Sequence, residues 1–273
     1  MPALQHQLAH LTTTALERAR SSGRPVVLLW PVGATEPHGP HAPLSTDCLI
    51  SEGVCRRAAE LLARSGEVEP LVLPTLAFGV TRYAREFDGA IGVSEATLQG
   101  IVVDVCTSLA RQSLQHVLIV NSHFEPEHVG TLHRALDALS DTGIRTGFLD
   151  LTRRERARRL TDEFRAGECH AGRYETSLIL ADRPELVDAA AAQELPYVSV
   201  NMASAIAEGV SEFKAMGLVR AYCGAPAEAS AEEGEQSYTV LSEMVAELAL
   251  ALVAGTGGRD APGMFTRVAE GER

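Results

Sequence analysis

The sequence lacks an excess of basic residues. Its 273 residues include 24 Lys and Arg against 36 Asp and Glu, which gives a formal net charge of −12 at pH 7 with neutral histidines. Nucleic acids and anionic membranes bind proteins through a positive surface that displaces counterions. The charge therefore argues against both kinds of partner, and we expect neither nucleic-acid nor membrane binding.

Paired cysteines are also lacking. The five cysteines are odd in number, widely spaced and never arranged as CxxC: Cys48, Cys55, Cys106, Cys169 and Cys223. Disulfide frameworks and zinc ribbons need paired cysteines at defined spacings. We interpret the five as reduced thiols that pack in the core of a cytoplasmic protein.

The sequence also lacks long apolar runs and a secretory signal peptide. No uninterrupted apolar stretch reaches the ~20 residues of a membrane span, and residues 1–6 show neither the basic nor the apolar region of a signal peptide. The composition, 45% hydrophobic and 22% charged, is typical of globular proteins. We therefore expect a soluble, cytoplasmic protein that forms a single domain over residues 1–273.

Apolar runs alternate with helical patterns along the chain. Four continuous apolar runs favour strands buried on both faces of a sheet: residues 25–30, 71–76, 116–121 and 146–151. Helical spacing predicts amphipathic helices at 5–20, 47–64, 95–112, from 126 and at 237–254, and residues 167–180 run from a polar loop into a further helix. This alternation predicts an α/β fold with a mainly parallel sheet. Residues 185–230 are weakly patterned, and the Gly-rich tail from about 255 is expected to fray.

The most distinctive stretch is the loop of residues 31–47, PVGATEPHGPHAPLSTD. Its prolines and glycines exclude a regular helix or strand. The loop follows the first predicted strand, and ligands bind beyond the carboxyl ends of strands in open parallel sheets. Glu36, His38 and Asp47 are therefore candidate metal ligands, although Asp47 taken alone is better explained as a helix N-cap.

Two further groups of His and carboxylate residues follow later strands. His123 and Glu125 come after the strand at 116–121, and His170 and Glu175 lie where a polar loop enters a helix. A single loop histidine is usually a hydrogen-bonded surface residue, but three such groups are hard to ascribe to chance. This donor set suits Zn²⁺, Mn²⁺ or Fe²⁺, and a shared carboxylate would hold two ions about 3.5–4 Å apart. We assign no role to the remaining interior histidines, His41, His116, His128 and His133.

Residues 31–47 closely resemble the PxGSTExHGPHLPLxTD stretch of the creatininase family of metal-dependent amidohydrolases. Three further segments agree in order and spacing: 78–89 resembles the family's YGxSxEHxxFPGT loop, 121–123 its NGH, and 170–177 its HAGxxETS. The resemblance spans roughly residues 25–235. It implies a three-layer α/β/α sandwich, usually assembled into homo-oligomers as hexamers. It also implies two bound divalent ions, zinc, manganese or both, with iron as an alternative.

The resemblance also implies roles for individual residues. Glu36, Asp47 and His123 match the ligands of one ion. His38, the shared Asp47 and Glu125 match those of the second ion, so that Asp47 bridges the two.

The remaining matched positions concern catalysis and substrate binding. His170 matches the family's catalytic histidine, and Glu175 matches a nearby carboxylate that either supports the site or binds metal directly. Thr81 and Phe124 fall where family members contact substrate. Glu168, one residue from the acid that precedes the catalytic histidine in creatininases proper, is a third predicted substrate contact.

The expected activity is hydrolysis of a C–N amide bond by a metal-activated water. Creatinine is not the expected substrate, because creatininases proper close the pocket with tryptophans near the third motif, whereas the only tryptophan here is Trp30, in a predicted strand. The 78–90 loop also departs from the family at Tyr83, Ala84, Asp88 and Ala90. We expect a small-molecule or short-peptide substrate, such as a cyclic amide, a formamide or a peptide amide, in a specialised biosynthetic or catabolic pathway.

Two alternatives stay open at this point. The first alternative is a non-catalytic binding or scaffold member of the family, although the complete ligand set argues against it. The second alternative is a hydrolase that uses Cys169 and His170, although adjacent residues seldom form a thiolate–imidazole pair.

Overall fold

The computed structural model describes residues 6–260. Within this range the central sheet has four strands in the order β2-β1-β3-β4, and every neighbouring pair is parallel. The strands are β1 (Val26–Val32), β2 (Glu69–Val72), β3 (His116–Asn121) and β4 (Arg145–Leu149). Strand β2 is shorter than predicted. Pro74 has no N–H group for the ladder, and the chain rejoins β1 only through a bridge between Leu76 and Val32.

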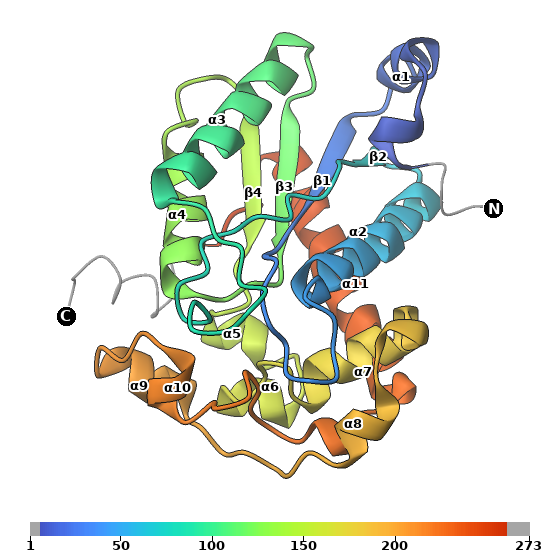
Figure 1. Cartoon of the computed structure of the whole chain (residues 1–273). Helices are drawn as coiled ribbons and strands as arrows, with labels where there is room; N and C mark the ends of the chain where they lie inside the picture. The colour runs from blue at the N-terminus through green and yellow to red at the C-terminus, as the bar shows by residue number, and fades with distance from the viewer. Residues whose placement is uncertain (1–5, 261–273) are drawn as a thin grey trace.

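Alternate residues of each strand point to opposite faces of the sheet and enter two cores. Val27 and Leu29 of β1 belong to one core, whereas Leu28 and Trp30 belong to the other. The first face is covered by α2 (Thr46–Ser65), α7 (Arg173–Asp182) and α11 (Ala231–Ala254). The second is covered by α3 (Glu95–Arg111) and α4 (Pro126–Asp137) (Figure 1). The predicted three-layer α/β/α sandwich is confirmed.

Shorter elements complete the described part of the chain. The predicted helix at 5–20 is divided into η2 (Leu8–His10) and α1 (Thr13–Arg20), because the Thr12 hydroxyl caps α1 by accepting the N–H of Ala15. The others are α5 (Arg154–Ala157), α6 (Asp162–Ala166), η3 (Pro184–Leu186), α8 (Ala189–Gln193), α9 (Met202–Ala207), α10 (Phe213–Met216) and η4 (Pro226–Glu228).

Helix α11 is longer than predicted, and among the described residues it alone is long and apolar enough to cross a membrane. The sequence does not show this as a continuous apolar run, because glutamates interrupt it. Half of its most apolar stretch is buried inside the fold, where Leu241, Met244 and Leu248 pack in the first core. This packing is that of a core helix.

The tail beyond α11 is partly ordered against the sheet. Phe148 of β4 donates its N–H to the carbonyl of Gly258, and the Asp260 carboxylate accepts two hydrogen bonds from Arg156. Residues 258–260, which we expected to fray, therefore run beside β4. The rest of the predicted frayed tail, residues 261–273, lies outside the described residues.

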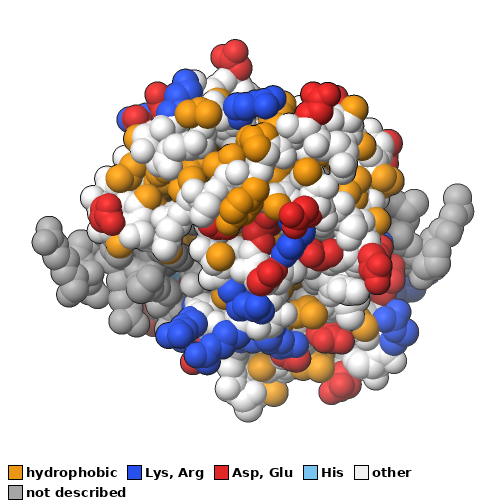
Figure 2. All heavy atoms as spheres, turned by 90° about the horizontal axis from the view of Figure 1, so that it is seen from below, with side chains coloured by type: hydrophobic (Ala, Val, Ile, Leu, Met, Phe, Trp, Pro, Cys, Tyr) orange, Lys and Arg blue, Asp and Glu red, His pale blue; other side chains and the backbone are white. Residues whose placement is uncertain are grey.

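All four strands direct their carboxyl ends toward one end of the molecule, the lower end in Figure 1. The loops after β1, β2 and β3 leave the sheet there, and α9 and α10 lie at the same end. We call residues 198–218, which include both short helices, the cap. The surface seen from this end mixes hydrophobic side chains with charged ones of both signs (Figure 2).

Candidate metal centre

The three loops predicted to carry ligands converge on one buried cluster. Six of its residues are at most 7% exposed: Glu36, His38, Asp47, His123, His170 and Glu175. Among residues 6–260 their ligand atoms form three overlapping groups, and within each group these atoms lie within 4.8 Å of one another. The groups are Glu36–Asp47–His123, His38–Asp47–Glu175 and Glu36–His38–His170. Asp47 is shared by the first two groups, which is the arrangement that a bridging carboxylate needs.

Each imidazole of the cluster directs one ring nitrogen at a backbone carbonyl. A carbonyl oxygen only accepts hydrogen bonds, so the nitrogen that faces it carries a proton, and the opposite nitrogen of a neutral ring is then an acceptor. The three contacts are His123 Nε2 to Val80 O at 2.8 Å, His38 Nδ1 to Glu36 O at 3.0 Å, and His170 Nε2 to Pro37 O at 3.1 Å. Backbone carbonyls thus fix the tautomers, as they commonly do for histidines that bind metal.

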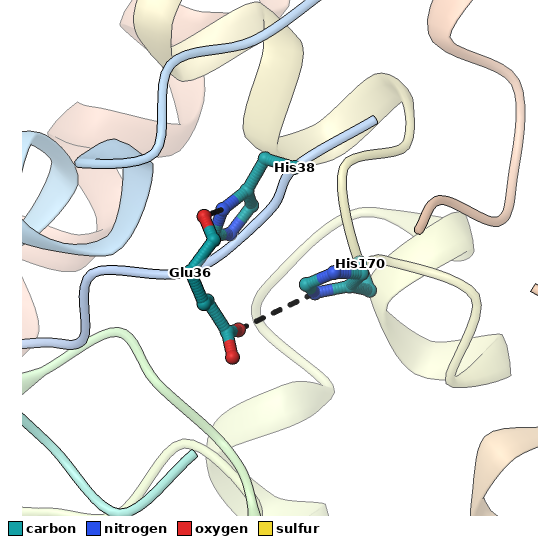
Figure 3. Close-up of side chains that lie close together, drawn as sticks. All are labelled: Glu36, His38 and His170. Atoms are coloured by element: carbon teal, nitrogen blue, oxygen red, sulfur yellow. Dashed lines mark hydrogen bonds and ion pairs between the residues drawn. The ribbon is translucent and has the colours of Figure 1, made fainter. Parts of the chain in front are cut away.

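The opposite nitrogens all face carboxylates. His123 Nδ1 lies 3.2 Å from both Glu36 Oε1 and Asp47 Oδ2. His38 Nε2 lies 3.0 Å from Asp47 Oδ1 and 3.6 Å from Glu175 Oε2, and His170 Nδ1 lies 3.9 Å from Glu36 Oε1 (Figure 3). Two acceptors that face each other repel, so a positive charge is needed between them. A proton or a divalent cation supplies it, and the donor set fits Zn²⁺ or Mn²⁺.

The shifted pKa values of the cluster also indicate that positive charge is needed between these groups. Burial disfavours the charged form of His38, but the carboxylate of Asp47 outweighs burial and raises the pKa of His38 to about 10. Burial is likewise outweighed at His123, where Glu36 and Asp47 raise the pKa well above its ordinary value. Burial opposes ionisation of Asp47 as well, but His38 holds its pKa below the usual range. A bound cation would replace these protons, because a ligating histidine is neutral.

His170 and Glu175 have different charge states from these histidines. Burial, and then the positive charge of His38, lower the pKa of His170 to about 4, so its ring is neutral at pH 7. Its ring contacts those of His38 and Phe213 in tilted arrangements, with centroid distances of 4.7 and 4.4 Å. Burial raises the pKa of Glu175 to about 8, and its carboxylate accepts the N–H of Ala171 at 2.7 Å.

Glu125, a predicted ligand, belongs to none of the three groups found among the described residues. Its Oε2 accepts the N–H groups of Arg82 at 2.7 Å and Tyr83 at 3.1 Å, and these bonds hold the carboxylate toward the 78–90 loop. Its Oε1 is buried without a hydrogen-bond partner among the described residues, and burial raises its pKa to about 8. The geometry places Glu175, and not Glu125, beside His38 and Asp47.

The cluster forms one wall of a cavity of about 70 Å³. The remaining walls are mostly apolar and include Tyr83, Phe124, Cys169, Met202, Ile206 and Phe213. Phe124 was predicted to contact substrate and does line the cavity. The three cap residues were missed, because the sequence pattern of their segment is weak; their only signal was apolar character. Tyr83 and Phe213 join the 78–90 loop to the cap through an edge-on ring contact at 6.2 Å.

Two predicted substrate contacts lie outside this cavity lining. The Thr81 hydroxyl donates a hydrogen bond to Glu36 Oε2, so it supports a cluster carboxylate. The Glu168 carboxylate accepts hydrogen bonds of 2.6 Å from the hydroxyls of Tyr197 and Ser199. These two hydroxyls hold Glu168 away from the cavity. Cys169, the next residue along the chain, lines the cavity instead.

The geometry does not favour the alternative of a cysteine hydrolase. Burial, and then the charge of Glu175, raise the pKa of the Cys169 thiol well above its ordinary value, whereas a nucleophilic thiol needs a lowered pKa. Both nitrogens of His170 face oxygen atoms of other residues. All five cysteines are free and buried, as predicted.

Comparison with known proteins extends these observations. The family model described as Creatininase: Creatinine amidohydrolase matches residues 9–249. The creatinine amidohydrolase of Pseudomonas putida is 32% identical over 186 residues, which are 62% of this chain and 69% of that protein. The mycofactocin precursor peptide peptidase of Mycolicibacterium smegmatis is 28% identical over 234 residues, 85% of this chain and 86% of that protein.

Solved structures show the same similarity. One described as Creatininase Mn has a TM-score of 0.69 and 27% identity, covering 89% of this chain and 96% of that chain. A mutant creatininase described as Zn-Zn type has a TM-score of 0.68 and 27% identity, covering 88% and 95%. The family match covers most of the sequence, and these two structures are described as manganese and zinc forms. This chain therefore belongs to the creatininase family of metal-dependent hydrolases.

Proposed function

We propose that this protein is an amidohydrolase that uses two divalent ions to hydrolyse a C–N amide bond in a small molecule or a short peptide. The observation that carries the proposal is the buried cluster, in which three imidazoles turn their free nitrogens toward carboxylates at one wall of an apolar cavity. The names of two relatives, a creatinine amidohydrolase and a precursor peptide peptidase, agree on amide hydrolysis and differ in substrate.

Asp47 would be shared by the two ions. Glu36 and His123 would complete one site, and His38 with Glu175 the other. Divalent ions held there would polarise an amide carbonyl and supply hydroxide at neutral pH. We propose zinc or manganese, with iron as an alternative.

His170 would move the proton that the reaction requires. An amide nitrogen is a poor leaving group until it is protonated, so a general acid must act at the bond that breaks. The carbonyl of Pro37 keeps the proton of His170 on Nε2 and leaves Nδ1 free. Because the ring is neutral at pH 7 and forms part of the cavity wall, Nδ1 can take a proton from the attacking water and pass it to the leaving nitrogen.

The apolar cavity walls favour a substrate with apolar groups next to the bond that is hydrolysed. A volume of about 70 Å³ is small beside the ~300–1,000 Å³ of typical ligand pockets. The cavity beside the cluster would hold the reacting end of a substrate. Trp30 is buried in β1, so the chain brings no tryptophan to the cavity, and we do not propose creatinine as the substrate.

We also propose a homo-oligomer, a hexamer by family resemblance, in the cytoplasm. Support comes from three exposed apolar side chains on loops beside the site, Leu44, Phe78 and Ile91, which are 42%, 46% and 52% exposed. Light scattering of the purified protein would test the assembly, and a monomer at micromolar concentration would contradict it.

The activity is tested by removing metal with a chelator, restoring Mn²⁺ or Zn²⁺, and measuring the free amino groups formed by hydrolysis of lactams, formamides and short peptides. We expect hydrolysis of one substrate class that the chelator abolishes and metal restores. Asp47→Ala serves as the inactive control. Hydrolysis that survives complete metal removal would refute the proposal, as would hydrolysis abolished by thiol alkylation alone.

A further inference from the structure

His128 is a buried histidine to which the sequence assigned no role. It lies in the first turn of α4, and its side chain is fully buried. Its ring packs edge-on against that of His123, with centroids 4.7 Å apart. It is in none of the groups of potential metal ligands found among the described residues. Its contacts instead lead to the backbone that holds His123.

The carbonyl of Val80 determines which nitrogen of His123 faces the cluster. His123 Nε2 donates to this carbonyl at 2.8 Å, which leaves Nδ1 directed at Glu36 and Asp47. Val80 lies in a segment without regular secondary structure, so no ladder of sheet hydrogen bonds holds its backbone. A separate contact must therefore fix it.

His128 supplies that contact. Its Nδ1 accepts the N–H of Val80 at 3.1 Å, which requires Nδ1 to be unprotonated and places the ring proton on Nε2. Nε2 then donates to Asn121 Oδ1 at 3.1 Å. The ring is therefore neutral, with its single proton on Nε2.

Asn121 closes the network on the backbone of His123. Its Oδ1 accepts the N–H of His123 at 3.2 Å, and its Nδ2 donates to the carbonyl of the same residue at 2.6 Å. His128 thus joins the group that orients the ring of His123 to the group that holds its backbone. Gly79 leaves room for this, since a Cβ there would lie 2.7 Å from His128 Nδ1.

We propose that His128 is a positioning residue: by holding the backbone of Val80 and the side chain of Asn121, it keeps Nδ1 of His123 aimed at the metal site. This inference rests on the metal centre proposed above. Groups that hydrogen-bond a metal ligand directly typically contribute a factor of about 10–100 in metal affinity, and His128 acts one contact further out, through Val80 and Asn121.

The test compares two substitutions at His128 in the full-length protein. His128→Phe keeps a ring of similar size and removes both hydrogen bonds, whereas His128→Gln keeps an acceptor and a donor separated by one atom, as in imidazole. Metal-depleted proteins are titrated with Co²⁺, and the affinity and the visible absorption spectrum are recorded. His133→Gln is the matched control, because His133 is equally buried on the same helix but pairs with Asp150, away from Val80.

We expect His128→Phe to weaken Co²⁺ binding by up to about 10-fold, the lower end of the effect of a direct ligand partner, and to alter the spectrum, and His128→Gln and His133→Gln to retain the wild-type spectrum. A role in filling space would give the reverse order, with Phe tolerated and Gln impaired, and would overturn the inference. If His128→Phe does not fold, His128→Gln decides, and a changed spectrum in it overturns the inference. A wild type that binds no Co²⁺ would overturn the metal centre itself, whereas normal binding by His128→Phe would overturn only the positioning role.

Discussion

Removing divalent ions should make the stability of this protein fall as pH rises above neutrality. His38 has a pKa of about 10 in the folded, metal-free cluster and about 6.5 in the unfolded chain. A histidine whose pKa folding raises stabilises the native state fully below its unfolded pKa, and this stabilisation is lost as pH rises through the folded pKa. At ~1.36 kcal/mol per pH unit, His38 alone accounts for at most about 5 kcal/mol between pH 6.5 and 10.

Two other groups act in the same direction. The pKa of His123 is raised well above its ordinary value, despite burial, by Glu36 and Asp47. Burial raises the pKa of the Glu175 carboxyl from its ordinary 4.5 to about 8. Between these two pH values the folded protein holds a proton that the unfolded chain has lost, so the stability of the fold decreases as pH rises from about 4.5 to 8. Each proton held only by the native state gives a slope of about −1.4 kcal/mol per pH unit, so the two histidines together give up to about −3 kcal/mol per unit.

Urea unfolding at pH 7, 8 and 9 measures this slope, in chelator and with saturating Mn²⁺. With metal bound the imidazoles are neutral ligands, so the slope should largely disappear. Asp47→Asn, which removes the carboxylate nearest His38, should reduce the slope of the metal-free protein. Metal-free stability that stays level or rises between pH 7 and 9 would refute the proposed charge state of the cluster.

Three further predictions concern single residues. His170→Ala should keep both ions and lower kcat about 10²–10⁴-fold; loss of metal on metal analysis would instead make His170 a ligand. Gly79→Ala should weaken Co²⁺ binding by displacing His128, whereas Gly100→Ala, at an open position of α3, should not; equal affinities would contradict this. Phe213→Ala should raise KM for apolar substrates more than it lowers kcat, because it removes a cavity wall; an unchanged KM would count against the cap as a specificity element.

The sequence predicted the sheet and the convergence of the His and carboxylate side chains for a physical reason. Strands buried on both faces of a parallel sheet are continuous apolar runs, and β3 begins and ends where its run does. The ligands follow these runs directly, so the parallel topology alone brings the loop of Glu36, His38 and Asp47 to that of His123. No knowledge of side-chain packing was needed for that step.

The parts that depend on side-chain direction were not predictable in this way. Glu125 has the spacing of a ligand, but two N–H groups of the 78–90 loop hold its carboxylate, and Glu175 lies beside His38 instead. Glu168 is held by hydroxyls from residues about 30 positions away. His128 acts on Val80, 48 residues earlier in the chain. Local spacing carries no information about such contacts.

The cap was missed for a different reason. Helices α9 and α10 have six and four residues, too few for a helical period to emerge from the sequence. Met202, Ile206 and Phe213 pack on the 78–90 loop and not on the central sheet. The same loop departs from the family pattern, so the residues that would select the substrate are those that the sequence describes least well.

Counting the divalent ions bound per chain tests the central claim most directly. Metal analysis of the purified protein and of Asp47→Ala, after reloading with Zn²⁺ or Mn²⁺, should give two ions per wild-type chain. Asp47→Ala should hold at most one and have no hydrolytic activity, because Asp47 belongs to both candidate sites. Two ions and full activity in Asp47→Ala would show that Asp47 does not bridge a dinuclear centre.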